Sequence, residues 1–349
     1  SDSLLCFDLH DSLSVDSAMV NGIMVPFSRP GNGSVCLQPL QEIQAGSHYI
    51  SGIWYQGFPP MGIGLGGYTH ALRKGSPEVW TLSQPFAGHT WWPVKDALGD
   101  KADSLRLVIK TDSSYTSAAP GSLSLDSAGR EVWIHRFPIP AYLVAFSVAN
   151  YVQLNETWNH SCGLPVELFQ LVYPDDSADV VRDTKYLRES MEFLCSFLEP
   201  YPYYPEKYGH AQFSRGGGME HPTMSFMGSF GFELTLHELA HHWFGNMVTC
   251  GSWADIWLNE GFATYLSGMG FERYYPQDWK SWKSKTQQSV WESPEGAVYV
   301  KDSLEVSRIF SSRWSYKKAA LVLHQLRWWM GDASFQAGLK SYLSDPELR

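Results

Sequence analysis

The sequence predicts a multidomain protein in which an amino-terminal all-β, sandwich-like domain precedes a domain of mixed α+β type. Up to about residue 150, short alternating apolar runs are separated by Gly, Pro, Asn and Ser, which is typical of strands and turns. After Asn150 the apolar residues recur at helical intervals instead. A chain of 349 residues is long enough for two or three buried cores. We therefore expect one domain over residues 1–152 and a second over residues 153–349.

The strand predictions for the first domain depend on its alternating and β-branched runs. Leu105, Leu107 and Ile109 alternate with polar residues, as the buried face of a strand requires. Residues 132–134 and 142–148 are rich in β-branched and aromatic side chains and are also expected to be strands. The segment 58–67, FPPMGIGLGG, is expected to be a loop or strand turn.

The helix predictions for the second domain depend on a period of 3.6 residues. In the segment from residue 177 to 198, apolar residues fall at helical spacing, and the helix is expected to stop at Pro200 and Pro202. Further helices are expected at about 232–247, at about 255–270, and at about 315–330 with an end near Gly331.

Composition and charge exclude several classes of protein. Hydrophobic residues make up 44% of the chain and aromatic residues 15%, which describes packed domains and not a disordered chain. The formal charge is -10 and Lys and Arg do not cluster, so we expect no nucleic-acid partner. No run of 18 apolar residues occurs, so we expect no membrane span in this chain.

The five cysteines are odd in number and lack any CxxC spacing. They form neither a disulfide framework nor a thiolate zinc site, although the pattern leaves room for one or two bridges. The redox compartment therefore stays open on this evidence. The chain begins with Ser1 and carries no signal peptide, which indicates a mature form or an expressed segment. The missing initiator Met and the many aromatics favour a secreted or periplasmic protein over a cytoplasmic one.

The strongest local pattern is His237-Glu238-Leu-Ala-His241 followed by Glu260. Two histidines four residues apart on a helix lie one above the other on the same face, close enough to share one ion. Zinc in catalytic sites commonly takes two His and one carboxylate and leaves its fourth position to water. Glu260 comes 19 positions after His241, on the next expected helix, and can supply the carboxylate. The pattern predicts one Zn²⁺ held by His237, His241 and Glu260.

Glu238 is expected to have a different role from these ligands. Its position on the helix directs the side chain to the side of the ion, where it would meet the attacking water and act as general base. His242 points about 100° away round the helix from His241. We expect His242 to be a packing or supporting residue and not a ligand.

At this point the sequence resembles the M1 class of gluzincin aminopeptidases. The segments that carry the resemblance are GGGMEH (216–221), HELAHHWFGNMVT (237–249) and WLNEGFATYL (257–266). They match the family's pattern of HExxH, eighteen intervening residues and Glu, with a GxMEN motif upstream. TWWPVKD (90–96), PIPAYLVAFSVANY (138–151) and SYKKAALVLHQLRWWMG (315–331) extend the likeness over nearly the whole chain. The resemblance implies a β domain followed by a thermolysin-like zinc metallopeptidase domain with a mixed sheet.

The resemblance also implies site residues that the local pattern does not. Tyr316 matches the Tyr of the family's YxKG segment, whose phenol would stabilise an oxyanion. Glu220 matches the GxMEN glutamate, which would bind the free α-ammonium of a peptide, and Gln84 falls where the family places a second amine contact. Gly217, Gly218 and Met219 would present their backbone to the substrate, where glycine allows close approach.

The sequence departs from the family at several positions. His221 stands where the family has Asn, and Ala319 where YxKG has Gly. Ser267 replaces a carboxylate that supports a ligating histidine in many members, so we expect weaker zinc binding unless another acceptor substitutes. Members usually continue into a helical domain that covers the site, whereas this chain stops at residue 349. We expect that domain to be absent, which leaves either a fragment or an unusually open site.

Zinc-dependent removal of the first residue from peptides with a free amino terminus is the function that the sequence favours. Glu220 and the GGGME run favour it over two other hydrolases, a metalloendopeptidase and a lipid-epoxide hydrolase. A weak or inactive zinc-binding fragment that needs a further domain is the alternative from another class. The retention of Glu238, which does not bind the metal, argues against that alternative. The sequence does not indicate the preferred first side chain.

Overall fold

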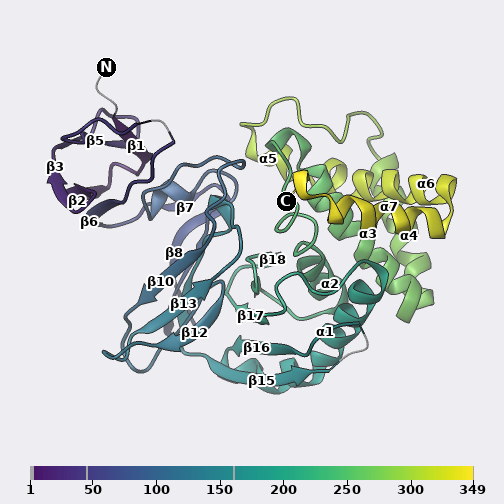
Figure 1. The fold of residues 1–349 in the computed structure, drawn as a ribbon. Helices are drawn as coiled ribbons and strands as arrows, with labels where there is room; N and C mark the ends of the chain where they lie inside the picture. Colours follow the sequence, from purple (N-terminus) through teal and green to yellow (C-terminus); the bar gives the residue numbers. More distant parts are fainter. Residues whose placement is uncertain (1–3, 45, 160–161, 349) are drawn as a thin grey trace.

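The computed structural model describes residues 4–44, 46–159 and 162–348 (Figure 1). The purple-to-blue half of the chain, up to Ala149, consists of sheets joined by turns and short 3-10 helices. The teal-to-yellow half, from Val152 onward, contains one further sheet and the α-helices. The new sheet thus begins at Val152, and the division into domains at residue 152 stays a prediction.

Two three-stranded sheets open the chain, with orders β1-β5-β4 and β3-β2-β6. Asn21 and Gly22 have φ values of 50° and 80°, as the tight turn between β2 and β3 requires. Leu9, Val35 and other apolar side chains of these sheets form a small core of their own. The strands are β1 (Leu5–Asp8), β2 (Leu13–Val20), β3 (Ile23–Val25), β4 (Phe27–Ser28), β5 (Ser34–Leu37) and β6 (Ser51–Gly57).

Two more sheets complete the β-rich half, with orders β11-β14-β9-β8-β7 and β10-β13-β12. The predicted strands at 105–109 and 132–134 are present as β10 and β13, which pair antiparallel. The predicted strand at 142–148 is wrong in part, because residues 141–143 form a short 3-10 helix directly after Pro140 and only 147–149 are extended. The strands are β7 (Met61–Ile63), β8 (Gly66–Arg73), β9 (Ser76–Leu82), β10 (Leu105–Ile109), β11 (Thr116–Ala118), β12 (Ser122–Leu125), β13 (Glu131–His135) and β14 (Ser147–Ala149).

The second half is built on a five-stranded mixed sheet of order β15-β16-β17-β19-β18. The outer pairs are antiparallel, whereas β16, β17 and β19 run parallel to one another. The mixed sheet that the family resemblance implies is therefore present. The strands are β15 (Val152–Trp158), β16 (Val166–Val172), β17 (Tyr208–Gln212), β18 (Gly218–Met219) and β19 (Met224–Met227).

The helices lie together at one side of this sheet in Figure 1, and their apolar faces share a core with it. The α-helices are α1 (Ser177–Phe197), α2 (Phe232–Ala240), α3 (Trp257–Tyr274), α4 (Pro276–Trp291), α5 (Val306–Ile309), α6 (Ala319–Met330) and α7 (Asp332–Ser344). Shorter helical turns are η1 (Gly88–Thr90), η2 (Ala141–Leu143), η3 (Pro174–Asp176), η4 (Trp253–Asp255) and η6 (Pro346–Leu348), and η5 (Ser312–Lys318) is a π-helix.

Helix α2 is shorter than the sequence predicts. It ends at Ala240 and not near residue 247. The chain continues in tight turns, and Gly245 has a φ of 134°, which a helix does not allow. Trp243 and Phe244 are buried in these turns. Their burial produces an apolar pattern that resembles the stripe of a longer helix.

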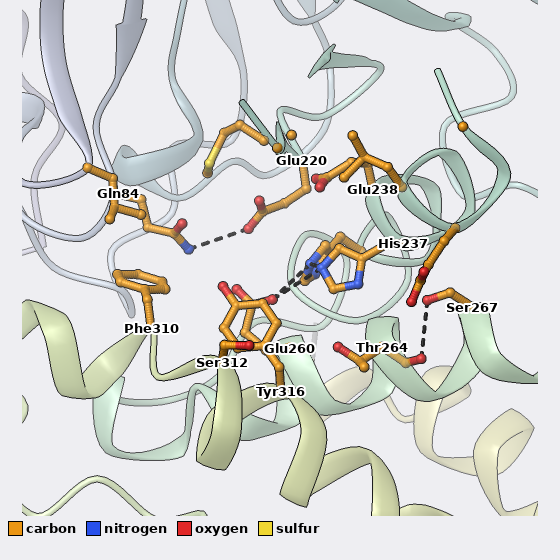
Figure 2. Close-up of a pocket in the computed structure, with 18 of the residues that line it drawn as sticks. Gln84, Glu220, His237, Glu238, Glu260, Thr264, Ser267, Phe310, Ser312 and Tyr316 are labelled. Carbon is orange, nitrogen blue, oxygen red and sulfur yellow. Dashed lines mark hydrogen bonds and ion pairs between the residues drawn. The ribbon is translucent and has the colours of Figure 1, made fainter. Parts of the chain in front are cut away.

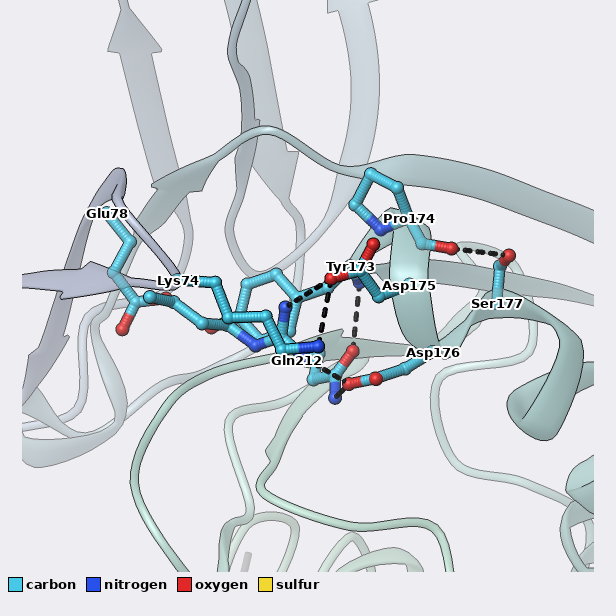
Figure 3. A network of polar contacts seen from close by, with 9 residues as sticks. Lys74, Glu78, Tyr173, Pro174, Asp175, Asp176, Ser177 and Gln212 are labelled. Atoms are coloured by element: carbon cyan, nitrogen blue, oxygen red, sulfur yellow. Dashed lines mark hydrogen bonds and ion pairs between the residues drawn. The ribbon is translucent and has the colours of Figure 1, made fainter.

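A polar network joins the β8–β9 hairpin to the start of α1 (Figure 3). Arg73 forms a 2.6 Å ion pair with Asp176 and lies over the ring of Tyr173. The Tyr173 hydroxyl donates in turn to Glu78 on β9, and Gln212 donates to Asp176 at 2.6 Å. The contacts tie β9 to the mixed sheet, and β9 leads directly into the segment that contains Gln84.

Two disulfides are present, Cys6–Cys36 between β1 and β5 and Cys162–Cys195 between the β15–β16 connection and α1. Cys250 is free and buried. These are the two bridges for which the sequence left room. Among the described residues, no helix is both long and apolar enough to cross a bilayer.

Candidate active site

His237 and His241 lie one helical turn apart on α2, and their Nε2 atoms approach to 3.1 Å. The two rings are nearly perpendicular, with centroids 4.7 Å apart. The spacing of four residues brings both imidazoles to one face of the helix, as the sequence predicts. Their nitrogens therefore point at one common position.

Glu260 adds a carboxylate oxygen at the same position. Its Oε2 lies 3.4 Å from Nε2 of His237 and 3.3 Å from Nε2 of His241. Glu260 is in the first turn of α3, which packs on α2. The three residues form a group whose ligand atoms are close enough to hold one metal ion. Two imidazoles and one carboxylate are a donor set that fits zinc.

The backbone orients His241 for metal binding. Its Nδ1 lies 3.1 Å from the carbonyl oxygen of Phe244, so an Nδ1–H can donate a hydrogen bond to that oxygen. The lone pair of Nε2 is then available to bind a metal ion. Burial lowers the pKa of His241, but the carboxylates of Glu220 and Glu260 outweigh burial and raise it to about 10. Burial opposes the charge of Glu260, whose contacts with the histidines nevertheless lower its pKa to about 2. The charges of the carboxylates and of this imidazole therefore stabilise one another within the ligand group.

His242 lies away from this position. Its Nδ1 is 2.9 Å from the hydroxyl of Tyr201 and its Nε2 is 3.3 Å from the hydroxyl of Ser225. Both ring nitrogens are therefore engaged in the core beneath the site. The structure thus places His242 as a packing residue beneath the ligand group.

Glu238 lies beside the ligand group and packs against the β18 strand. A Cβ atom at Gly218 would be 2.4 Å from the Glu238 carboxyl carbon, so a side chain at position 218 would displace this carboxylate. Burial raises the pKa of Glu238 well above its ordinary value, and the nearby Glu220 and Glu260 carboxylates add to the effect.

Glu220 and Gln84 form a second polar pair, contributed by the two halves of the chain (Figure 2). Gln84 Nε2 donates to Glu220 Oε1 at 3.4 Å. Both side chains are buried, with exposed fractions of 2% and 3%, and burial raises the pKa of Glu220. The side chain of Asn246 fixes the segment by donating to the backbone carbonyl of Glu220 at 2.7 Å.

Tyr316 approaches the ligand group from the π-helix η5. Its ring stacks on His237 with centroids 6.0 Å apart and planes inclined by 13°. Burial raises the pKa of Tyr316 well above its ordinary value, and the carboxylates of Glu260, Glu220 and Glu238 add to this shift. A π-helical turn is common at functional sites, because its wider turn redirects a side chain.

All ten predicted site residues line one cavity of about 900 Å³ (Figure 2). They are Gln84, Gly217, Gly218, Met219, Glu220, His237, Glu238, His241, Glu260 and Tyr316. Gly217 has a φ of 82°, which few other residues adopt. The structure therefore brings together in one space every residue that the sequence proposed for the site.

The cavity also has lining residues that the sequence reasoning missed. Phe310 and Ser312 lie just before Tyr316 in the chain, and Figure 2 shows Ser312 next to Tyr316 and Phe310 toward Gln84. Arg215 lies just before the glycine run. Proximity to a motif is the only signal that the sequence offered for these residues.

Each departure from the family pattern has a structural counterpart. The Ser267 hydroxyl donates to the carbonyl of Ala263 at 2.7 Å, so it is engaged with its own helix. His221 is fully buried, with Nδ1 3.1 Å from the carbonyl oxygen of Leu143. Ala319 packs on α3 so tightly that a Cβ at Gly261 would lie 2.6 Å from the Ala319 methyl group.

Residues 230–348 match the model of the peptidase family M1 domain. Among characterised proteins, aminopeptidase 2 of Candida albicans is 38% identical over 120 residues, which is 32% of this chain and 13% of that protein. Aminopeptidase M1-D of Oryza sativa is 32% identical over 193 residues, or 52% of this chain and 20% of that protein. The chain thus matches only a minor part of the length of these relatives.

Solved structures resemble the chain over almost its whole length. The M1 zinc metallopeptidase of Deinococcus radiodurans is 25% identical, with a TM-score of 0.79, over 98% of this chain and 78% of that one. The match to leukotriene A4 hydrolase of Saccharomyces cerevisiae spans 98% of this chain and 56% of that protein's chain, with a TM-score of 0.74. At 18% identity the latter shows a likeness of fold alone.

Proposed function

The chain belongs to peptidase family M1, and from this premise we propose that it is a zinc-dependent aminopeptidase, which removes the first residue from peptides with a free amino terminus. One observation carries the proposal. A metal-binding group and the buried Glu220–Gln84 pair line the same cavity. The first favours hydrolysis, and the second favours substrates that begin with an ammonium group.

We assign His237, His241 and Glu260 as the residues that hold one Zn²⁺. When bound, zinc polarises the peptide carbonyl as a Lewis acid and lowers the pKa of a water molecule to about 7. The convergence of two imidazole nitrogens and one carboxylate oxygen within 3.4 Å of one another supports this assignment.

Glu238 is the general base in this proposal. Its carboxylate lies along the cavity wall beside the ligands, where it accepts a proton from the attacking water and then passes that proton to the leaving amine nitrogen. Tyr316, on the opposite element η5, donates its hydroxyl to the oxygen on which negative charge develops. Gly217, Gly218 and Met219 offer backbone groups to the extended substrate at the edge of the mixed sheet.

Glu220 and Gln84 hold the α-ammonium of the substrate. The side chain that hydrogen-bonds to the buried Glu220 carboxylate is a neutral amide, so a substrate ammonium can add a direct ion pair there. An internal peptide segment has no such cation. The pair therefore makes the enzyme select the end of a chain and disfavours an endopeptidase.

We propose an amino-terminal β domain over residues 1–152 and a thermolysin-like catalytic domain over residues 153–349, because the mixed sheet begins at Val152. We also propose a secreted or periplasmic location. The Cys6–Cys36 and Cys162–Cys195 disulfides support an oxidising compartment.

Zinc content and substrate selectivity test this function together. Zinc per chain is measured by elemental analysis, and hydrolysis is measured on a panel of amino-acid anilides, each free and N-acetylated. The proposal predicts about one zinc per chain and cleavage of the free anilides only. Cleavage of the acetylated anilides at equal rates would contradict the role of Glu220, and zinc without any turnover would contradict the activity.

A further inference from the structure

Arg215 begins the segment that forms one wall of the cavity, and Glu220 ends it. Gly217 accepts a hydrogen bond from the backbone of Gly228 at 2.8 Å. A Cβ at Gly228 would lie 2.1 Å from the Arg215 carbonyl oxygen. The wall is thus packed closely against Gly228, and this packing fixes the backbone from which the Arg215 side chain extends.

Among the described residues, the Arg215 guanidinium has no ion-pair partner. It donates a 3.5 Å hydrogen bond to the carbonyl of the neighbouring Gly216. Arg188 and Arg327, in contrast, form ion pairs with Glu156 and Glu272. Arg215 and Glu238 line the same cavity. An unpaired cation therefore lies on the cavity wall close to the proposed general base.

The direction of the substrate places the leaving part of a peptide toward Arg215. Glu220 and Gln84 hold the amino terminus, and the first carbonyl must face the metal ligands and Glu238. An extended peptide advances about 3.3 Å per residue. Residues after the cleaved bond consequently pass Glu238 and continue along the glycine run toward Arg215.

Besides Arg215 and the carboxylates of the proposed site, two more charged side chains line the cavity. Lys317 donates to the hydroxyl of Ser289 at 3.1 Å, and Glu233 accepts from the indole of Trp282 at 3.0 Å. Both are held by α4, whereas Arg215 is not. Arginine also presents two parallel N–H groups that match the two oxygens of a carboxylate.

We propose that Arg215 binds a carboxylate on the leaving part of the substrate, and this proposal rests on the aminopeptidase function above. The carboxylate is either the α-carboxylate of a short peptide or an acidic side chain that follows the cleaved bond. Arg215 is thus a specificity-determining residue, which directs the enzyme toward dipeptides and tripeptides or toward acidic second residues.

Matched substrate pairs distinguish the two sources of the carboxylate. The first pair is leucyl-alanine and leucyl-alaninamide, which differ in the α-carboxylate. The second is leucyl-aspartyl-amide and leucyl-asparaginyl-amide, which differ in the side chain. We expect a preference in kcat/KM of about tenfold or more for the carboxylate in at least one pair, because an Arg–carboxylate contact is a charge-assisted hydrogen bond.

Arg215→Gln should abolish the preference, so that the ratio of kcat/KM values within each pair falls to near unity. Arg182→Gln is the matched control, because Arg182 is an exposed arginine on α1 paired with Asp179. Equal rates within both pairs for the wild type, or a preference that survives in Arg215→Gln, would overturn the proposal.

A binding experiment separates failure of this proposal from failure of the proposed function. Calorimetry on the zinc-loaded Glu238→Gln variant measures the dissociation constants of the same four peptides without turnover. A carboxylate preference in binding that Arg215→Gln removes supports the role of Arg215 even if no peptide is hydrolysed. Equal dissociation constants would refute that role whether or not the enzyme is active.

Discussion

Gly218 lies so close to Glu238 that a Cβ at position 218 would be 2.4 Å from the Glu238 carboxyl carbon. The two residues come from different elements, the edge strand β18 and helix α2. The strand therefore acts as a wall that fixes where the carboxylate can lie. From the sequence, we expect glycine here because it lets the backbone approach the substrate. The structure adds a second reason, which is the space that the Glu238 carboxylate occupies.

Gly218→Ala should displace the Glu238 carboxylate and lower kcat by roughly tenfold or more, since small misplacements of a catalytic group are costly. Zinc content should not change, because no ligand is touched. Gly216→Ala is the control, as a Cβ at Gly216 meets nothing within 4 Å. Equal activity of the two variants would show that the contact does not position Glu238.

Glu220→Gln should weaken binding of leucinamide by about 30-fold or more, because it removes the buried charge that pairs with the ammonium. N-acetyl-leucinamide, which has no ammonium, should bind the wild type and the variant alike. Calorimetry on the zinc-loaded proteins measures both. An equal loss for the two ligands would exclude Glu220 as the amine anchor.

Ser267→Glu should strengthen zinc binding, by roughly tenfold if the new carboxylate supports a ligating histidine. Ser267 lines the cavity near His237 in Figure 2, and its own hydroxyl is engaged with Ala263. Ser267→Gln controls for size. Zinc affinity is measured by competition with a chelator, and the prediction fails if the Glu and Gln variants bind zinc equally.

His221→Asn should make the protein less sensitive to acid. Burial lowers the pKa of His221 from 6.5 to about 3. Between these values the unfolded state binds one more proton than the folded state, so the free energy of unfolding falls as the pH falls. The contribution is at most about 1.4 kcal/mol per pH unit.

Chemical denaturation of the wild type and His221→Asn at several pH values between 6.5 and 3 measures this effect. The stability of the variant relative to the wild type should rise steadily as the pH falls through that range. His210, whose pKa burial also lowers to about 3, is present in both proteins and cancels in the difference. A difference independent of pH would contradict the prediction.

The metal-binding group was predictable because its geometry is local. His237 and His241 need only one helical turn, and a single further helix brings Glu260 to them. Gln84 lies 136 residues before Glu220, and only the family resemblance, not the local pattern, could place it. The end of α2, the π-helix that contains Tyr316 and the position of Arg215 depend on tertiary packing, which the spacing of apolar residues does not reveal.

The most direct test of the account is the zinc content and turnover of Glu238→Gln. Because His237, His241 and Glu260 are assigned as the metal ligands and Glu238 as the base, this variant should keep about one zinc per chain. Its kcat on free amino-acid anilides should fall by roughly 10²- to 10⁴-fold. Loss of zinc in the variant, or retention of wild-type turnover, would contradict the separation of ligands from base on which the proposed mechanism depends.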